Sequence, residues 1–366
     1  MTSDDWAGRA LAAVIDRVTA TEAEVGDRFP LYAHPADGRW ETTGRGSWTG
    51  GFWAGLLWLR ALRTGSAADR AAAERCTARL APWAGADTAT RGLIFWYGTA
   101  LAPAASGAGP VRAAAARSCL ADHDPGAGVV PWGSALGGPR LLARADAVPG
   151  LVPLLAGAGP DGPGAAAAHL HRHLDLCLGA EGAGHPGRPR PAWRFDPATG
   201  WHPCEDPAPG WSRGEAWLLL AVADALLHPE VARHRPVRLA SAARQLLSQQ
   251  GVLTGRLVPP DHATRPRGPL DTSAAAITAV ALLKLSRTRV PRAGACAPRA
   301  AAVLRRLAGA HLTAPEPDGG RPAGMLLDGC YDAAKGLAVR HELIWGDFFL
   351  ALGLAALDGL VDLTRV

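Results

Sequence analysis

The sequence predicts an all-α fold, specifically an (α/α)6 barrel, and three observations support this. Ala and Leu dominate the apolar residues, Val and Ile are scarcer, and the chain has only three Tyr and six Phe, a balance that favours helices over strands. Apolar periodicity and Gly/Pro breaks divide the 366 residues into twelve helical segments, with no convincing strand between them. Short and long links alternate between the segments, which suggests six helical hairpins closed into a ring.

The expected helices are 5–24, 50–64, 68–82, 91–102, 108–122, 146–157, 163–178, 212–227, 235–249, 271–287, 296–311 and 343–358. Short links follow the even-numbered helices, and the links after the odd-numbered ones are mostly long: 25–49, 83–90 (the shortest), 123–145, 179–211, 250–270 and 312–342. Short links make antiparallel pairs, and long loops are usually functional. We therefore expect one domain, 1–366, whose long loops gather at the rim where the inner helices begin.

Hydrophobic patterning separates inner from outer helices. The segments 272–285 and 344–357 are apolar nearly all round, as helices of an inner ring should be. The segment 67–81 has one charged face, which is typical of an outer helix. Helix N-termini at the loop-bearing rim favour anions.

Composition excludes several classes of function. The net charge is +5, but Lys284 and Lys335 are the only lysines and no arginine run is interleaved with aromatic residues, so we expect no nucleic-acid partner. The six cysteines form no CxxC pair and are expected to be free thiols in a reducing compartment. The acidic N-terminus does not resemble a signal peptide, and no apolar run reaches membrane-spanning length. We expect a cytoplasmic monomer or homodimer with no membrane partner.

Tryptophan, arginine and aspartate recur where the inner helices are expected to begin. The stretch GRGSWTGGFWAGLLWL (44–59) combines Trp48 with glycines that would let the helix start approach a flat ligand. The later helix starts and the loop before the sixth helix contribute Arg91, Trp132, Asp146, Arg213 and Trp217. Carbohydrate sites need flat apolar faces together with charged groups for orientation and proton transfer. Their convergence at one rim predicts a sugar-binding pocket.

Other residues have simpler structural interpretations. Asp271 precedes TSAAAI and is assigned to helix capping, and Trp58 and Trp96 are assigned to packing. His169 and His173 share one helix face as a metal pair would, but no third ligand is nearby. No metal and no other cofactor is therefore expected.

Four ordered motifs resemble the unsaturated glucuronyl hydrolases. They are WTGGFWAGLLWL (48–59), WSRGEAW (211–217), DTSAAAITAVALLKL (271–285) and ELIWGDFFLALGLAAL (342–357). These enzymes form glycoside hydrolase family 88, with the related unsaturated rhamnogalacturonyl hydrolases of family 105. The resemblance implies an (α/α)6 barrel, no metal, and a small anionic saccharide or glycoconjugate substrate that ends in a Δ4,5-unsaturated uronic acid.

The resemblance also implies a mechanism and roles. In that family the ring's vinyl ether is hydrated: an acid protonates C4, water adds at C5, and the hemiketal opens and expels the leaving sugar. By position, Asp146 corresponds to the acid/base aspartate. Arg213 and Trp217 match residues that contact the sugar and its carboxylate, and Trp48 and Trp132 match aromatic walls of the uronate subsite.

The chain departs from the family pattern at the fourth helix. There the family's second active-site aspartate falls on Gly92, next to Arg91, which we place among the substrate-binding candidates. Asp87, His202 and Glu205 are further substitutes for the missing group, and Glu215 replaces the usual glutamine. Two hypotheses follow: an unsaturated-uronide hydrolase or hydratase with an altered substrate, or a catalytically silent barrel that binds a sugar-like ligand, for example in a biosynthetic pathway.

Overall fold

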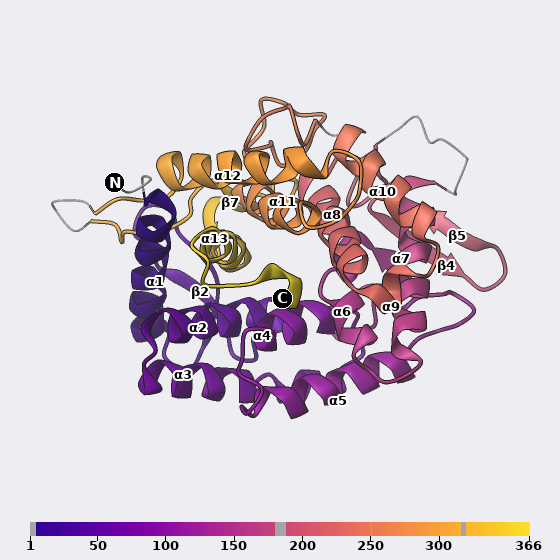
Figure 1. Ribbon diagram of the computed structural model, residues 1–366, viewed down its shortest axis with the longest axis horizontal. Helices are drawn as coiled ribbons and strands as arrows, with labels where there is room; N and C mark the ends of the chain where they lie inside the picture. The colour runs from indigo at the N-terminus through magenta and orange to yellow at the C-terminus, as the bar shows by residue number, and fades with distance from the viewer. Residues whose placement is uncertain (1–4, 180–187, 250, 316–319) are drawn as a thin grey trace.

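The computed structural model describes residues 5–179, 188–249, 251–315 and 320–366, and these are mostly helical (Figure 1). The helices are α1 (Trp6–Val25), α2 (Gly50–Thr64), α3 (Ala67–Ala78), α4 (Tyr97–Thr99), α5 (Ala108–Ala121), α6 (Leu151–Ala156), α7 (Gly162–Leu178), α8 (Ser212–Leu227), α9 (Pro229–Ala232), α10 (Pro236–Gln249), α11 (Thr272–Leu285), α12 (Ala293–Ala310) and α13 (Ile344–Leu357). A π-helical turn, Gly92–Trp96, precedes α4, and short 3-10 turns include Ser47–Thr49 and Ala145–Ala147. The predominance of helix confirms the prediction from composition.

Contacts between helices run around an inner ring. α13 packs on α2, α2 on α4 and the π-helical turn, that turn on α6, α6 on α8, α8 on α11, and α11 on α13 again. The helices α1, α3, α5, α7, α10 and α12 pack outside it; in Figure 1, α3 and α5 follow one edge and α12 the opposite one. This is the alternation of inner and outer helices expected from the loop lengths.

Burial explains which helices lie inside. Every residue of α11 is buried except Thr278, because its sequence offers no polar face to solvent. By contrast, α12 buries five residues along one stripe and exposes arginines on the other face. The carboxylate of Asp271 accepts hydrogen bonds from the backbone N–H groups of Ser273 and Ala274, which confirms its prediction as a helix cap.

The expectation of no strands is wrong. β1 (Phe29–Ala33), β2 (Trp40–Thr43), β6 (Gly329–Asp332) and β7 (Leu337–Leu343) form a sheet in the order β2-β1-β7-β6, and β3 (Leu142–Arg144), β4 (Ala192–Asp196) and β5 (Gly200–Pro203) form a second. All pairings are antiparallel. Each strand is three to seven residues long, which is short for alternation to stand out in a sequence. All of them lie in expected long loops, apart from the last residue of β7, Leu343.

The fourth and sixth inner segments differ from the expected helices because their backbones cross closely. A Cβ on Gly92 would lie 2.2 Å from the backbone nitrogen of Leu151, and a Cβ on Gly150 would lie 2.5 Å from the Gly92 carbonyl oxygen. Gly150 also has a φ of 69°, which glycine tolerates best. The helix expected at 146–157 therefore starts only at Leu151, and Asp146 lies in the turn before it.

The remaining composition-based expectations concern cysteines and membranes. All six cysteines are free, and five of them are buried. Among the described residues, no helix combines the length and hydrophobicity that crossing a bilayer requires.

Candidate functional site

A cavity of about 1220 Å³ opens where the inner segments begin. It brings together five of the six residues expected at the site, Trp48, Trp132, Asp146, Arg213 and Trp217. The 3-10 turn before α2, the strand β3, the first turn of α8 and the strand β6 all contribute to its lining. Residues as far apart in the sequence as Trp48 and Leu337 thus meet at one rim, as the alternation of links predicts.

Arg144 binds the carboxylate of Asp146 with two parallel hydrogen bonds. Its Nε donates to Oδ1 over 3.0 Å and its Nη2 to Oδ2 over 3.1 Å. The same guanidinium lies over the ring of Trp132, 4.9 Å from the ring centroid. Burial lowers the pKa of Arg144, but the charge and hydrogen bonds of Asp146, together with Asp206 and Cys204, raise it, so the net pKa is raised. Asp146 thus faces the cavity beside a permanent cation.

Aromatic rings form another wall of the cavity. Trp48 is half-buried, donates its indole N–H to the Tyr331 hydroxyl over 3.0 Å, and packs against Trp345 with ring centroids 4.8 Å apart. Trp217 is buried and stacks on Phe52, with ring centroids 6.4 Å apart. Trp48 and Trp132 therefore offer partly exposed faces to a ligand, whereas Trp217 lies deeper.

The glycines beside Trp48 serve packing, which differs from the expectation that they admit a ligand. A Cβ on Gly50 would lie 2.9 Å from Cδ2 of Leu80, and one on Gly51 would lie 2.2 Å from the carbonyl oxygen of Ile94. Gly50 and Gly51 therefore let the start of α2 approach neighbouring segments of the protein. Trp58 is buried and donates to the Thr77 hydroxyl over 2.9 Å, as its assignment to packing requires.

Arg213 lines the cavity, but its guanidinium is already engaged by the protein. Nη1 donates to Oδ2 of Asp271 over 2.7 Å and to the Cys330 carbonyl over 2.5 Å, and Nη2 donates to the Tyr331 carbonyl over 2.7 Å. Its side chain is 4% exposed. The expected contact with a sugar carboxylate therefore does not fit this geometry, because both terminal nitrogens join α8, α11 and β6.

Arg91 is the sixth expected residue, and it does not line the cavity. Its buried guanidinium donates through Nη2 to Asp122 over 2.7 Å and through Nε to the Thr88 carbonyl over 2.9 Å. The side chain thus reaches the end of α5 instead of the rim. The substrate-binding role expected for Arg91 is therefore corrected to a structural one.

The small sheet adds a polar face that sequence reasoning largely missed. Leu142 pairs with Arg194, and Arg194 pairs with His202 across β3, β4 and β5. All three line the cavity, as does Arg144, two residues after Leu142 and thus on the same face. Of the arginines lining this cavity in the described part of the chain, only Arg194 has no ion pair with an acid. In the sequence, only the spacing of Arg144 and Asp146, two residues apart, indicates that a cation lies beside the carboxylate in this part of the site.

Glu215 and the histidine pair lie away from this cavity. Glu215 lines a smaller cavity on another side of α8, and burial raises its pKa to about 8. Nδ1 of His169 accepts a hydrogen bond from the Val130 N–H over 3.0 Å, and burial lowers the pKa of His169. Within the described residues, no group of three His, Cys, Asp or Glu residues is arranged to hold a metal ion.

Comparison with known proteins agrees with this architecture. No protein-family model matches the sequence, and no curated protein matches it. Among solved structures, the unsaturated glucuronyl hydrolase of Bacillus sp. GL1 matches with a TM-score of 0.78 and 20% identity over 96% of this chain and 97% of that one. The chain has the fold of the unsaturated glucuronyl hydrolases. The enzyme from Streptococcus agalactiae matches with a TM-score of 0.79 and 18% identity over 100% and 94% of the two chains.

A third structure was solved with a saccharide. It is a substituted unsaturated glucuronyl hydrolase with dGlcA-Glc-Rha-Glc, which matches with a TM-score of 0.80 and 21% identity over 95% of this chain and 96% of that one. The unsaturated glucuronyl hydrolase fold therefore covers nearly the whole chain.

Proposed function

We propose that this protein is an (α/α)6-barrel enzyme that hydrates and cleaves saccharides or glycoconjugates ending in a Δ4,5-unsaturated uronic acid. The observation that carries the proposal is the position of Asp146, at the rim of a large cavity with Trp48 and Trp132. Flat aromatic faces suit sugar rings, and a carboxyl group beside them can transfer protons. The shared fold supports a carbohydrate ligand.

In the proposed reaction, Asp146 transfers protons to and from the unsaturated ring. Its protonated carboxyl gives a proton to C4 of the vinyl ether, and the positive charge that develops is centred on C5. Water adds at C5 while the carboxylate of Asp146 takes a proton from it, which restores the acid. The resulting hemiketal opens to a ketone at C5 and leaves a hemiacetal at C1, which becomes an aldehyde as the C1–oxygen bond breaks and the leaving sugar departs with its hydroxyl. Arg144 aims the carboxyl group and stabilises the carboxylate that forms when the proton moves to C4.

The substrate's own carboxylate is assigned to the face of the small sheet. Arg194 presents a guanidinium there without an acid partner in the described residues, with His202 beside it. A guanidinium binds a carboxylate through two parallel hydrogen bonds. Arg213 instead holds the wall that carries Tyr331 in place.

Gly92 points to an altered substrate. A side chain at that position would collide with the backbone of Leu151, because a Cβ on Gly92 would lie 2.2 Å from the Leu151 nitrogen. Position 92 therefore supplies no second carboxylate beside Asp146, and Arg144 adds a cation next to it. Because of this local balance of charge, we expect a more anionic substituent than plain unsaturated glucuronides carry.

The second candidate is a barrel that binds such a sugar without chemistry. The Arg144–Asp146 pair favours it, because Arg144 already engages both carboxylate oxygens of Asp146 and the pair must separate before the carboxyl group can contact a substrate. Wild-type protein and an Asp146→Asn variant should therefore be compared on a panel of sulfated and unsulfated unsaturated disaccharides. Loss of the ultraviolet absorbance of the C4=C5 bond measures turnover, and calorimetry measures binding.

The enzyme proposal expects turnover by wild type and at least about a 100-fold loss in Asp146→Asn, with binding retained. Binding without turnover in both proteins would favour the silent barrel. Turnover that survives in Asp146→Asn would remove Asp146 from the mechanism.

A further inference from the structure

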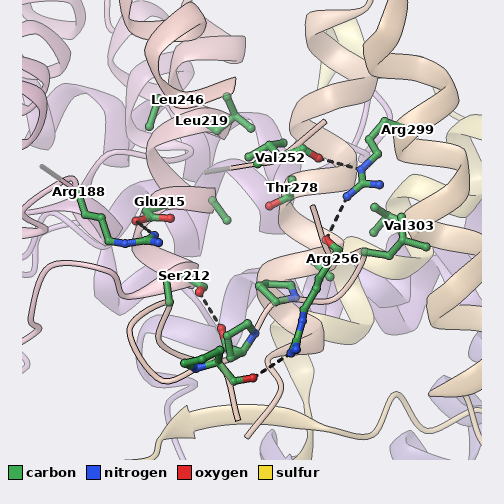
Figure 2. Close-up of a pocket in the computed structure, with 18 residues that line it drawn as sticks. Arg188, Ser212, Glu215, Leu219, Leu246, Val252, Arg256, Thr278, Arg299 and Val303 are labelled. Atoms are coloured by element: carbon green, nitrogen blue, oxygen red, sulfur yellow. Dashed lines mark hydrogen bonds and ion pairs between the residues drawn. The ribbon is translucent and has the colours of Figure 1, made fainter. Parts of the chain in front are cut away.

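A second cavity, of about 240 Å³, lies on another side of α8 (Figure 2). The helices α8, α10, α11 and α12 line it together with the segment 251–266. That segment also borders the large cavity: Pro260 and Ala263 line the small one, and Asp261 and His262 line the large one. The two cavities thus share one wall.

Most of the small cavity's lining is apolar. Its lining includes Leu219, Leu246, Leu257 and Val303. Thr278 lies between Leu219 and Val303 and contributes a hydroxyl group (Figure 2). An apolar cavity of about 150 Å³ holds a benzene molecule. The space of about 240 Å³ found here therefore suits a ring with a short side chain.

At one end of the cavity, Glu215 is a buried carboxyl group. Its side chain is 11% exposed, and its Oε1 accepts no hydrogen bond from the described residues. The nearest cation is Nη1 of Arg188, 3.9 Å away. Because burial raises its pKa to about 8, Glu215 is mostly protonated and uncharged at neutral pH.

At the other end, Arg256 and Arg299 bring positive charge (Figure 2). Arg299 donates to the carbonyls of Val252 over 2.8 Å and Gly255 over 2.6 Å, and Arg256 donates to the Pro266 carbonyl over 2.9 Å. Neither forms an ion pair with an acid in the described residues, and burial lowers the pKa of Arg299. Arg256 is exposed and Arg299 half-buried, so both guanidinium groups reach solvent as well as the cavity, and a carboxylate bound in the cavity would give them the acid partner that the described residues do not supply.

We propose that this cavity is a binding site for a small organic carboxylate with an apolar body, whose carboxylate contacts Arg256 and Arg299. The apolar body fills the space between Leu219 and Val303. Because Glu215 is uncharged, the arginines that line the cavity give it a net positive charge. The proposal does not depend on the saccharide chemistry of the large cavity.

Three probes with one shared body test the preference for an anion. The full chain is titrated at pH 7 by calorimetry with 3-phenylpropionate, 3-phenylpropan-1-ol and 3-phenylpropylamine. We expect the carboxylate to bind at least about tenfold more tightly than the alcohol, because a hydrogen bond to a charged group is stronger than one between neutral groups. The amine should bind most weakly. Equal affinity for carboxylate and alcohol, or no binding of any probe, would overturn the proposal.

Variants at Thr278 locate the binding. Thr278→Phe fills the middle of the cavity and should abolish binding of 3-phenylpropionate, whereas Thr278→Val, of nearly the same volume, should retain it. Binding that persists in a folded Thr278→Phe protein belongs elsewhere and contradicts the proposal. Arg256→Gln should weaken binding about tenfold, and Arg267→Gln, at an exposed position that does not line the cavity, should leave it unchanged.

The pH dependence of binding gives an independent readout. As the pH rises through about 8, Glu215 ionises and reduces the positive charge of the cavity, so the affinity for 3-phenylpropionate should fall. The other charged residues that line the cavity, Arg188, Arg256 and Arg299, keep their charge throughout this range. Glu215→Gln should bind the probe and lose this pH step. An unchanged pH profile in that variant would contradict the assignment.

Discussion

Arg144 holds both carboxylate oxygens of Asp146, with Nε 3.0 Å from Oδ1 and Nη2 3.1 Å from Oδ2. The two residues lie at the end of β3 and in the turn that follows, so the backbone fixes their separation. The ring of Trp132 lies over the Arg144 guanidinium, with 4.9 Å between the guanidinium carbon and the ring centroid, and restricts its movement. In the proposed mechanism, Arg144 is a positioning residue that aims the carboxyl group into the cavity.

Replacing Arg144 should therefore lower turnover more than substrate binding. We expect Arg144→Met to reduce kcat by about 100-fold, because a displacement of about 1 Å at the reacting group can have an effect of that size. Arg144→Lys should recover part of the loss, since lysine restores the charge but not the two parallel hydrogen bonds. Steady-state kinetics on the best substrate of the disaccharide panel measures kcat and KM for wild type and both variants.

Arg140 provides a matched control for Arg144. It pairs with Asp87 over 3.2 Å in the preceding loop and is half-exposed, so Arg140→Met should change kcat by less than about twofold. If Arg144→Met behaves like Arg140→Met, Asp146 is oriented by other contacts.

Arg194 should act on substrate binding instead. Arg194→Gln is expected to raise KM for an unsaturated uronide about tenfold with little change in kcat, because a carboxylate loses a charged hydrogen bond. A methyl ester of the same saccharide should bind wild type and variant alike. The KM values of acid and ester in the two proteins give the test, and an equal rise for both would assign Arg194 a structural role.

Local sequence patterns predict helix bounds, helix caps and the side of the barrel on which the inner helices begin. The helix expected at 212–227 has those bounds in α8, because its apolar run is long and uninterrupted. Asp271 was predicted as a cap from the residue type and its place before an apolar segment, and it is one. Trp48, Trp132 and Asp146 meet at one rim because alternating link lengths place helix starts on the same side.

What local patterns missed depends on contacts between distant parts of the chain. Arg213 is engaged by Asp271, 58 residues away, and no local pattern shows such a partner. The residues flanking Asp146 owe their arrangement to the pairing of β3 with β4, about 50 residues apart in the sequence. Arg91 is expected at the rim because it opens the helix predicted at 91–102, but its guanidinium is held by Asp122, 31 residues further along the chain.

Gly92 provides a stability test of the crossing between the fourth and sixth segments. Gly92→Ala should lower the free energy of unfolding by about 1–3 kcal/mol, because its Cβ would meet the backbone nitrogen of Leu151 at 2.2 Å. Gly92→Asp should be more destabilising. Gly309, which is exposed in α12 with nothing within 4 Å of a Cβ, is the control: Gly309→Ala should be neutral or stabilising by up to about 1 kcal/mol. Urea denaturation compares them, and equal effects at both glycines would contradict the close crossing.

Glu215 should make the stability of the protein depend on pH. Its pKa is raised by burial from the ordinary 4.5 to about 8, so both folded and unfolded chains carry the proton below pH 4.5. Between these values the unfolded chain releases the proton while the folded protein keeps it, so the free energy of unfolding falls as the pH rises. Glu215→Gln removes this effect, and the variant should gain stability over wild type as the pH rises through this window, by at most about 5 kcal/mol above pH 8.

The control for Glu215 is Glu230→Gln, at a position with a side chain that is 55% exposed and pairs with Arg233. An exposed pair of this kind contributes little, so the stability of Glu230→Gln should follow the wild-type pH profile. Urea denaturation of the three proteins between pH 4 and pH 9 compares the slopes. Because glutamine matches glutamate in shape, a difference that is constant with pH would reflect packing, and it would contradict a buried, protonated carboxyl group. A difference that grows from pH 4.5 and levels off near pH 8 is the expected signature.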